Sequence, residues 1–341
     1  CTSFAILVMW RMTEYLRFFL LFVMGLGFVY LVLWQINFKK DEPVFGLTFS
    51  QIYAEGLGLD WREVYSAILS ELNPRKVRLI AYWQNLEPQK DKFNFADLDW
   101  QIKEAQKKNA EIVLVLGYRV PRWPECHAPN WTKSLKKEEF DEELLSYLKE
   151  LILHYRSFSS IKVWQVENEP LLSFFGDCPK AEREFLKKEI ETVKALDSRP
   201  VMITDSGELS LWLRTMGLSE FLGTTLYRVV WNKYAGWSES VYPPVFYTIR
   251  SGIAKRIFKN KEVIISELQA EPWTAYRKPL TEVDFEEQIK HFSVKNLKNN
   301  IEFAEKTGLR EIYLWGVEWW YWRKLRGDEN FWNFGKETFR Q

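Results

Sequence analysis

Two glutamates stand in short polar segments that each directly follow an apolar run. Glu169 lies in WQVENEP (164–170), and Glu267 lies in IISELQ (264–269). Two carboxyl groups can together catalyse a nucleophilic substitution at a carbon atom, because one delivers a proton to the leaving oxygen while the other attacks as a nucleophile. The two segments are far apart in the chain. This chemistry therefore depends on a fold that brings them to one place.

After residue 41 the chain alternates short apolar runs with amphipathic stretches. We interpret eight runs as strands: 44–49, 77–83, 112–118, 161–167, 201–205, 223–227, 263–267 and 312–317. Between them, Leu, Ile and Phe recur at helical spacing among Lys and Glu, clearest in 97–109, 138–156, 181–197 and 285–308. Apolar strands that alternate with helices indicate a parallel sheet covered on its outside. Eight such units predict an α/β fold, the (β/α)8 TIM barrel. A doubly wound open sheet is less consistent, because no glycine-rich phosphate loop follows the first strand.

In a barrel of this kind, catalytic groups lie at the carboxyl ends of the strands. Glu169 would follow the fourth strand and Glu267 would end the seventh. Glycoside hydrolysis uses two carboxyl groups at one barrel mouth, about 5–5.5 Å apart when configuration is retained. We expect Glu167 to be a structural carboxylate below the site. Glu271 is a rival nucleophile if the seventh strand ends later than we predict.

The two segments resemble those of clan A glycoside hydrolases, the barrel superfamily that includes families 5, 39 and 42. The resemblance extends over most of 44–320, although only short motifs carry it. It implies that Glu169 is the acid/base, that Glu267 is the nucleophile and that Asn168 holds the sugar 2-hydroxyl.

Three further residues fall where clan A members place residues that support the nucleophile and the sugar. Arg78 interrupts an apolar run and so needs a buried partner; by the resemblance it binds the nucleophile and keeps it ionised. Tyr227 would orient the nucleophile, and Trp315 would form the floor of a sugar subsite. The third and sixth strands lack the histidines that family 5 members commonly carry, so the resemblance leaves the particular family and substrate open.

Many tryptophans follow the predicted strands, and an indole face matches the C–H face of a pyranose ring. We predict that Trp83, Trp123 and Trp273 bind substrate. Loop packing is the alternative for part of the ring-rich mouth, which also contains Trp131, Trp231, Trp237, Trp319 and Trp320.

The composition disfavours several other functions. The chain has 47 basic and 46 acidic residues, which argues against nucleic acid as a partner. With three His and three Cys and no CxxC pair, we expect no metal site, and the proposed chemistry needs no cofactor. Cys126 and Cys178 follow the third and fourth strands. A disulfide there would brace the rim, and two free cysteines are equally consistent.

The segment 18–36, FFLLFVMGLGFVYLVLWQI, carries no charge and is long enough to cross a bilayer. No small-residue cleavage site follows it, which favours an uncleaved signal anchor. We therefore divide the chain into an anchor segment, 1–40, and one catalytic barrel domain, 41–341, whose tail 323–341 forms the last helix. We expect a membrane-anchored protein with an extracytoplasmic catalytic domain.

The resulting hypothesis is a retaining glycoside hydrolase that cleaves β-linked bonds of oligo- or polysaccharides by double displacement. Two alternatives remain: a tethered carbohydrate-binding barrel without turnover, and a transglycosylase that uses the same carboxyl pair. The joint presence of Glu169, Glu267, Arg78 and Asn168 favours an enzyme over a binding protein.

Overall fold

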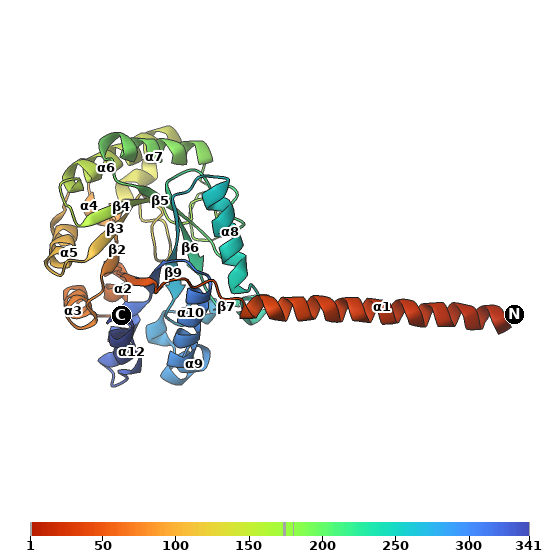
Figure 1. Ribbon diagram of the computed structural model, residues 1–341. Coiled ribbons are helices and arrows are strands. Elements are labelled where there is room, and N and C mark those ends of the chain that lie inside the picture. Colours follow the sequence, from red (N-terminus) through yellow and green to blue (C-terminus); the bar gives the residue numbers. More distant parts are fainter. Residues whose placement is uncertain (1, 173–174, 180, 341) are drawn as a thin grey trace.

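The chain folds into a closed barrel of eight parallel strands surrounded by helices (Figure 1). The computed structural model describes residues 2–172, 175–179 and 181–340. Around the barrel the strand order is β1-β10-β9-β6-β5-β4-β3-β2. The bounds are β1 (Val44–Thr48), β2 (Lys76–Ile80), β3 (Glu111–Leu116), β4 (Ile161–Val166), β5 (Val201–Asp205), β6 (Phe221–Leu226), β9 (Glu262–Gln269) and β10 (Glu311–Trp315). This confirms the predicted (β/α)8 architecture.

The helices cover the outside of the barrel with one apolar face each. They are α2 (Gln51–Gly56), α3 (Trp61–Ala67), α4 (Trp83–Leu86), α5 (Ala96–Lys107), α6 (Lys137–Tyr155), α7 (Arg183–Leu196), α8 (Pro244–Arg256), α9 (Phe285–His291), α10 (Val294–Lys306), α11 (Val317–Lys324) and α12 (Asn330–Phe339). In α6, for example, Leu144, Leu148, Leu151 and Tyr155 are fully buried at three- and four-residue spacing. A small antiparallel hairpin, β7 (Val229–Asn232) and β8 (Gly236–Glu239), follows β6.

Two layers of apolar side chains hold the barrel together. The outer faces of the strands and the helices form the main core, and a small cluster fills the barrel interior: Val113, Val163, Met202, Ile264 and Tyr313. The Tyr313 ring fits because Gly46 has no side chain; a Cβ at Gly46 would lie 2.8 Å from that ring.

Three predicted elements differ most from the structure. The second strand ends at Ile80 instead of residue 83, and Trp83 begins α4. The single helix predicted over 285–308 is two helices, because the Ser293 side chain caps a new helix by accepting a hydrogen bond from the backbone of Asn296. The last helix begins at Asn330 rather than at residue 323.

The amino-terminal helix α1 (Thr2–Gln35) projects away from the barrel (Figure 1). Within it, Tyr15–Gln35 is long and apolar enough to cross a membrane, with a mean hydropathy of 2.3 and no part buried. Its last turns contact the barrel. The Tyr30 hydroxyl donates to the carbonyl of Val241 at 2.6 Å, and the Trp34 ring meets Phe303 at 5.7 Å and the Arg228 guanidinium at 5.0 Å.

Candidate functional site

A cavity of about 680 Å³ opens at the carboxyl ends of the barrel strands. That volume is within the range of small-molecule sites. The cavity brings together most of the residues predicted from sequence: Trp123, Asn168, Glu169, Tyr227, Glu267, Trp273 and Trp315. Arg78 lies beneath its floor and is fully buried.

Glu267 reaches this cavity because β9 carries an extra residue. Thr224 and Thr225 are adjacent in β6, but their partners in β9 are Ile265 and Glu267. The ladder between β9 and β10 shows the same irregularity. An unmatched residue of this kind is a β-bulge, which changes the direction of the side chains that follow.

The bulge decides where the carboxyl group points. Val263 and Ile265 pack in the outer core, and Ile264 points into the barrel. With regular alternation Glu267 would share the outward direction of Ile265. The extra residue instead places Glu267 inside the barrel mouth and returns Leu268 to the outer core.

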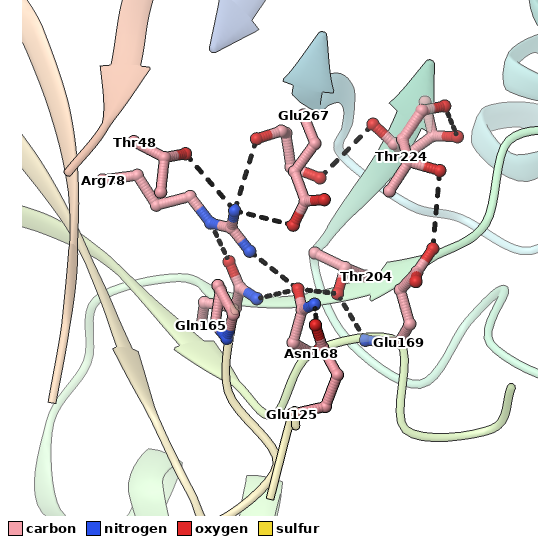
Figure 2. Close-up of polar contacts among 12 residues, drawn as sticks. Thr48, Arg78, Glu125, Gln165, Asn168, Glu169, Thr204, Thr224 and Glu267 are labelled. Carbon is pink, nitrogen blue, oxygen red and sulfur yellow. Dashed lines mark hydrogen bonds and ion pairs between the residues drawn. The ribbon is translucent and has the colours of Figure 1, made fainter. Parts of the chain in front are cut away.

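Two groups hold the Glu267 carboxylate in place. The Arg78 guanidinium forms an ion pair with Oε1 at 2.9 Å, and the Tyr227 hydroxyl donates to Oε2 at 3.0 Å. Figure 2 shows Arg78 between Glu267 on one side and Asn168 on the other. Arg78 also donates to Asn168 Oδ1 at 2.7 Å and to Gln165 Oε1 at 2.8 Å. Its charge is therefore paired and its donors are used, as burial requires.

Glu169 is presented to the same cavity by a tight turn after β4. Glu167 and Glu169 both have positive φ, 57° and 44°, a conformation that costs energy for residues other than glycine and is concentrated at functional sites. The Glu169 backbone N–H donates to Thr204 Oγ1 at 2.8 Å. Burial raises the pKa of the Glu169 carboxyl well above its usual value, and the charges of Glu267 and Glu125 raise that pKa further. Glu169 is thus suited to hold a proton at neutral pH.

Glu167 does not face the cavity. Its carboxylate accepts hydrogen bonds from the backbone N–H groups of Tyr118 and Arg119 at 3.0 and 2.7 Å. Gly117 leaves room for it, since a Cβ there would overlap the Glu167 carboxyl group. These contacts make Glu167 a brace for the loop after β3.

That loop supplies the predicted Trp123 and two residues that we did not predict from sequence, Arg122 and Glu125. All three line the cavity, and Arg122 and Glu125 have φ of 84° and 74°. Glu125 accepts a hydrogen bond from the Asn168 amide at 3.2 Å (Figure 2). Burial, followed by the Glu267 charge, raises the pKa of Glu125 to about 7. In the sequence, the only sign of Arg122 and Glu125 as site residues is that each is a charged residue in the loop after the third strand.

The site therefore contains a third carboxyl group whose charge acts on Glu169. We expect Glu125→Gln to shift the basic limb of the kcat/KM profile to lower pH by about one unit. A general acid must be protonated, so activity falls as pH rises through its pKa, and removal of the Glu125 charge lowers that pKa. Profiles of the parent, Glu125→Gln and the exposed control Glu150→Gln would test this. An unmoved limb in Glu125→Gln would show that its charge does not reach Glu169.

Glu271 lines the cavity but is held by a different cation. Arg122 pairs with Glu271 and with Glu318, and the Tyr53 hydroxyl donates to Glu271 at 2.6 Å. The Arg122 guanidinium lies 3.5 Å from the centre of the Tyr53 ring and 4.1 Å from that of Trp315. Glu271 therefore belongs to a buried ion network beside the Glu267 carboxylate.

The structure separates the predicted tryptophans. Trp123, Trp273 and Trp315 line the cavity, and Trp123 is 42% exposed. Trp83 does not: it is fully buried, stacks on Tyr147 at 5.0 Å and belongs to the core. It lies there because the chain leaves the strand at Ile80. Among the other rings at the mouth, Trp319 and Trp320 are also fully buried.

Cys126 and Cys178 form a disulfide, which settles the alternative left open by the sequence. The two cysteines are 52 residues apart in the chain, and their bridge joins the loop after β3 to the segment after β4. The bridge therefore ties the loop that carries Arg122, Trp123 and Glu125 to the rim.

Loss of this bridge should destabilise the barrel. In the chain-entropy treatment, a disulfide that closes a loop of this length stabilises the folded state by about 4 kcal/mol. We expect Cys178→Ser to lower the free energy of unfolding by up to about that amount in denaturant titrations. The matched control is Cys1→Ser, which leaves the bridge intact. Equal unfolding midpoints for the two variants would contradict the prediction.

Comparison with known proteins gives a family match over part of the chain. A family model described as Glycosyl hydrolase family 10 matches residues 77–182, the part that contains Arg78, Glu125 and Glu169. No curated protein sequence matches the chain.

The barrel is similar to solved glycosidase structures. Xylanase 10B from Thermotoga maritima is 15% identical, with a TM-score of 0.53 over 80% of this chain and 82% of that chain. A family 10 endo-β-1,4-xylanase from Gloeophyllum trabeum is 13% identical, with a TM-score of 0.53 over 80% and 84%. A GH5_18 protein from Bifidobacterium longum subsp. longum is 12% identical, with a TM-score of 0.57 over 81% and 70%. At these identities the structures establish a common fold. With the family match, they confirm the resemblance to clan A glycoside hydrolases.

Proposed function

We propose that this protein is a retaining glycoside hydrolase that acts on β-linked oligo- or polysaccharides. The observation that carries the proposal is the carboxyl pair: Glu267, turned inward by the bulge and held by Arg78 and Tyr227, shares one cavity with Glu169. One group is paired with a cation and the other has a raised pKa. A nucleophile and a general acid need these two states at the same pH.

The mechanism would proceed in two displacements. Protonated Glu169 gives its proton to the glycosidic oxygen while Glu267 attacks the anomeric carbon and forms a glycosyl ester. The aglycone leaves as an alcohol. Glu169, now a carboxylate, removes a proton from water, which attacks the same carbon and releases Glu267. Two inversions give net retention.

The substrate-binding roles follow from the same geometry. Trp315 and Trp273 line the cavity and would contact the sugar, and Asn168 lies beside Arg78 where the 2-hydroxyl would be held. Because the Asn168 amide N–H already donates to Glu125, we propose that Glu125 takes part in reading the 2-position.

The test is the stereochemistry and covalent chemistry of turnover. Endo-β-1,4-xylanases are among the structural neighbours, so xylan and aryl β-xylosides come first in a panel of β-glycosides. We expect the first-formed product to have the β configuration by NMR. A 2-deoxy-2-fluoro glycoside should label the peptide that contains Glu267.

Other outcomes would select the alternatives. An α product would exclude double displacement. Sugar binding without turnover on any substrate would favour the carbohydrate-binding barrel, and transfer to added sugar acceptors in preference to water would indicate a transglycosylase.

We also propose that α1 is a signal anchor and that the barrel is extracytoplasmic. The apolar span Tyr15–Gln35 supports the anchor. The Cys126–Cys178 bridge supports an oxidising compartment for the barrel. Protease protection of the full chain in sealed vesicles of known orientation tests both statements.

A further inference from the structure

We infer that the barrel also lies against the lipid bilayer, through a surface that we call the apolar ridge: Leu209, Leu211, Leu213, Val241, Ile249 and Ile257. The inference rests on the proposed membrane span of α1 and does not depend on the proposed chemistry.

Exposed apolar side chains of the barrel are unevenly distributed. The ridge residues are 57–68% exposed, and Tyr234 and Phe258 are exposed in the same part of the chain. Elsewhere in the described barrel, the exposed large apolar side chains are Trp123, Leu153, Tyr276 and Leu325. Single exposed apolar residues are ordinary on a protein surface, whereas a concentration of them marks an interaction surface.

The ridge residues come from two segments that pack together. Arg250 of α8 donates to the carbonyls of Gly207 and Ser210, at 2.8 and 2.7 Å, and its guanidinium lies 3.8 Å from the centre of the Trp212 ring. Trp212 is buried, so Leu211 and Leu213 on either side of it are turned outward.

The outward face of α8 continues the ridge. Ile249, Ile253 and Ile257 recur every four residues and so form one stripe. Ile253 in the middle of the stripe is half-buried against the core, whereas Ile249 and Ile257 on either side of it are 57% and 68% exposed. Exposed cations border it, at Arg214, Arg256 and Lys259.

The position of α1 indicates that a membrane covers the apolar ridge. Figure 1 shows α8 on the side of the barrel from which α1 projects, with one end of α8 beside the barrel end of α1. Tyr30 of α1 bonds directly to Val241 of the ridge at 2.6 Å. Tyr30 lies inside the apolar span, so the contact leaves little distance between that side of the barrel and the membrane. Leucine and isoleucine side chains flanked by Arg and Lys suit the interface of an anionic lipid surface.

Docking would also orient the cavity. Leu209 and Val241 belong both to the ridge and to the cavity lining. The rim of the cavity would therefore lie at the lipid surface, within reach of glycans that are attached to that surface.

The experiment uses the full chain reconstituted in vesicles that contain anionic lipid. Cys1 is replaced by Ser, and an environment-sensitive fluorophore is attached to one new cysteine at a time, in Leu211→Cys, Ile257→Cys or Leu153→Cys. Leu153 is the matched control because it is 42% exposed but lies on α6, away from the ridge. Phe22→Cys in α1 reports insertion of the anchor. Thermal unfolding of each labelled protein must match that of the parent.

We expect quenching by doxyl lipids at positions 211 and 257 to exceed that at 153 by at least about threefold, together with a blue shift. Quenching at position 22 with none at 211 and 257 would overturn the inference and leave the anchor standing. No quenching at position 22 would show that α1 does not span the membrane, and the inference would fall with it. A blue shift at 211 and 257 that depends on protein concentration and not on doxyl lipid would also overturn it, and would indicate a second copy of the chain as the occupant.

Discussion

Glu267→Gln should lower kcat by about 10⁴-fold or more, because the amide cannot form the glycosyl ester. The fold should persist, since glutamine has the same shape and can still contact Arg78 and Tyr227. The measurement is steady-state turnover of an aryl glycoside, with circular dichroism and thermal unfolding as checks on the fold. Addition of azide to Glu267→Ala should yield the α-glycosyl azide, since the small anion enters the space left by the nucleophile.

The matched variant is Glu271→Gln, which tests the rival nucleophile. Glu271 is engaged by Arg122 and Tyr53, whereas Arg78 and Tyr227 hold Glu267. We expect Glu271→Gln to retain kcat within about tenfold of the parent and to lose about 1–3 kcal/mol of stability, because Arg122 loses one charged partner and keeps the other, Glu318. Full loss of turnover in Glu271→Gln with activity retained in Glu267→Gln would reverse the assignment.

Glu169→Ala should divide substrates by the quality of their leaving group. General acid catalysis contributes about 10²–10⁴-fold, so glycosides with alkyl or sugar leaving groups should lose about that factor in kcat/KM. The dinitrophenolate leaving group departs without a proton, so the rate of the first step with a dinitrophenyl glycoside should fall far less. Azide should restore its turnover and give the β-glycosyl azide.

The same variant should also lose the basic limb of the pH profile. That limb depends on the proton of Glu169, whose pKa is raised by burial and by its acidic neighbours. If Glu169→Ala lost the same factor on every leaving group and kept the limb, another residue would be the acid.

The barrel could be predicted because its strands are continuous apolar runs and its helices have regular polar and apolar faces. The two catalytic candidates could be predicted because they sit in short segments at strand ends, where this fold collects its chemistry. Arg78 was identifiable for a related reason: a lone charge within an apolar strand requires a buried partner, and the structure supplies Glu267, Asn168 and Gln165.

The loop after β3 could not be predicted, because its conformation depends on contacts distant in sequence. Arg122 and Glu125 reach the cavity through positive φ values that neither residue type favours. The Cys178 bridge and the Glu167 carboxylate hold that loop from the next unit of the barrel. Trp83 shows the converse case. A tryptophan near a strand end suits a sugar cleft as well as a core, and only the early end of β2 assigns it to the core.

Because of the bulge in β9, the position of Glu267 in the sequence does not by itself give the direction of its side chain. Omission of the single unmatched residue beside Glu267 would restore regular pairing to both neighbouring strands. The same omission would leave Glu267 opposite Thr225 and pointing into the barrel mouth, because the residue after the outward-pointing Ile265 points inward in a regular strand. The carboxylate would turn toward the surrounding helices only if the strand kept its length and lost the bulge. Among distant relatives, a glutamate one residue after an outward-pointing position in a regular strand, or two residues after it in a bulged strand, would therefore face the mouth alike.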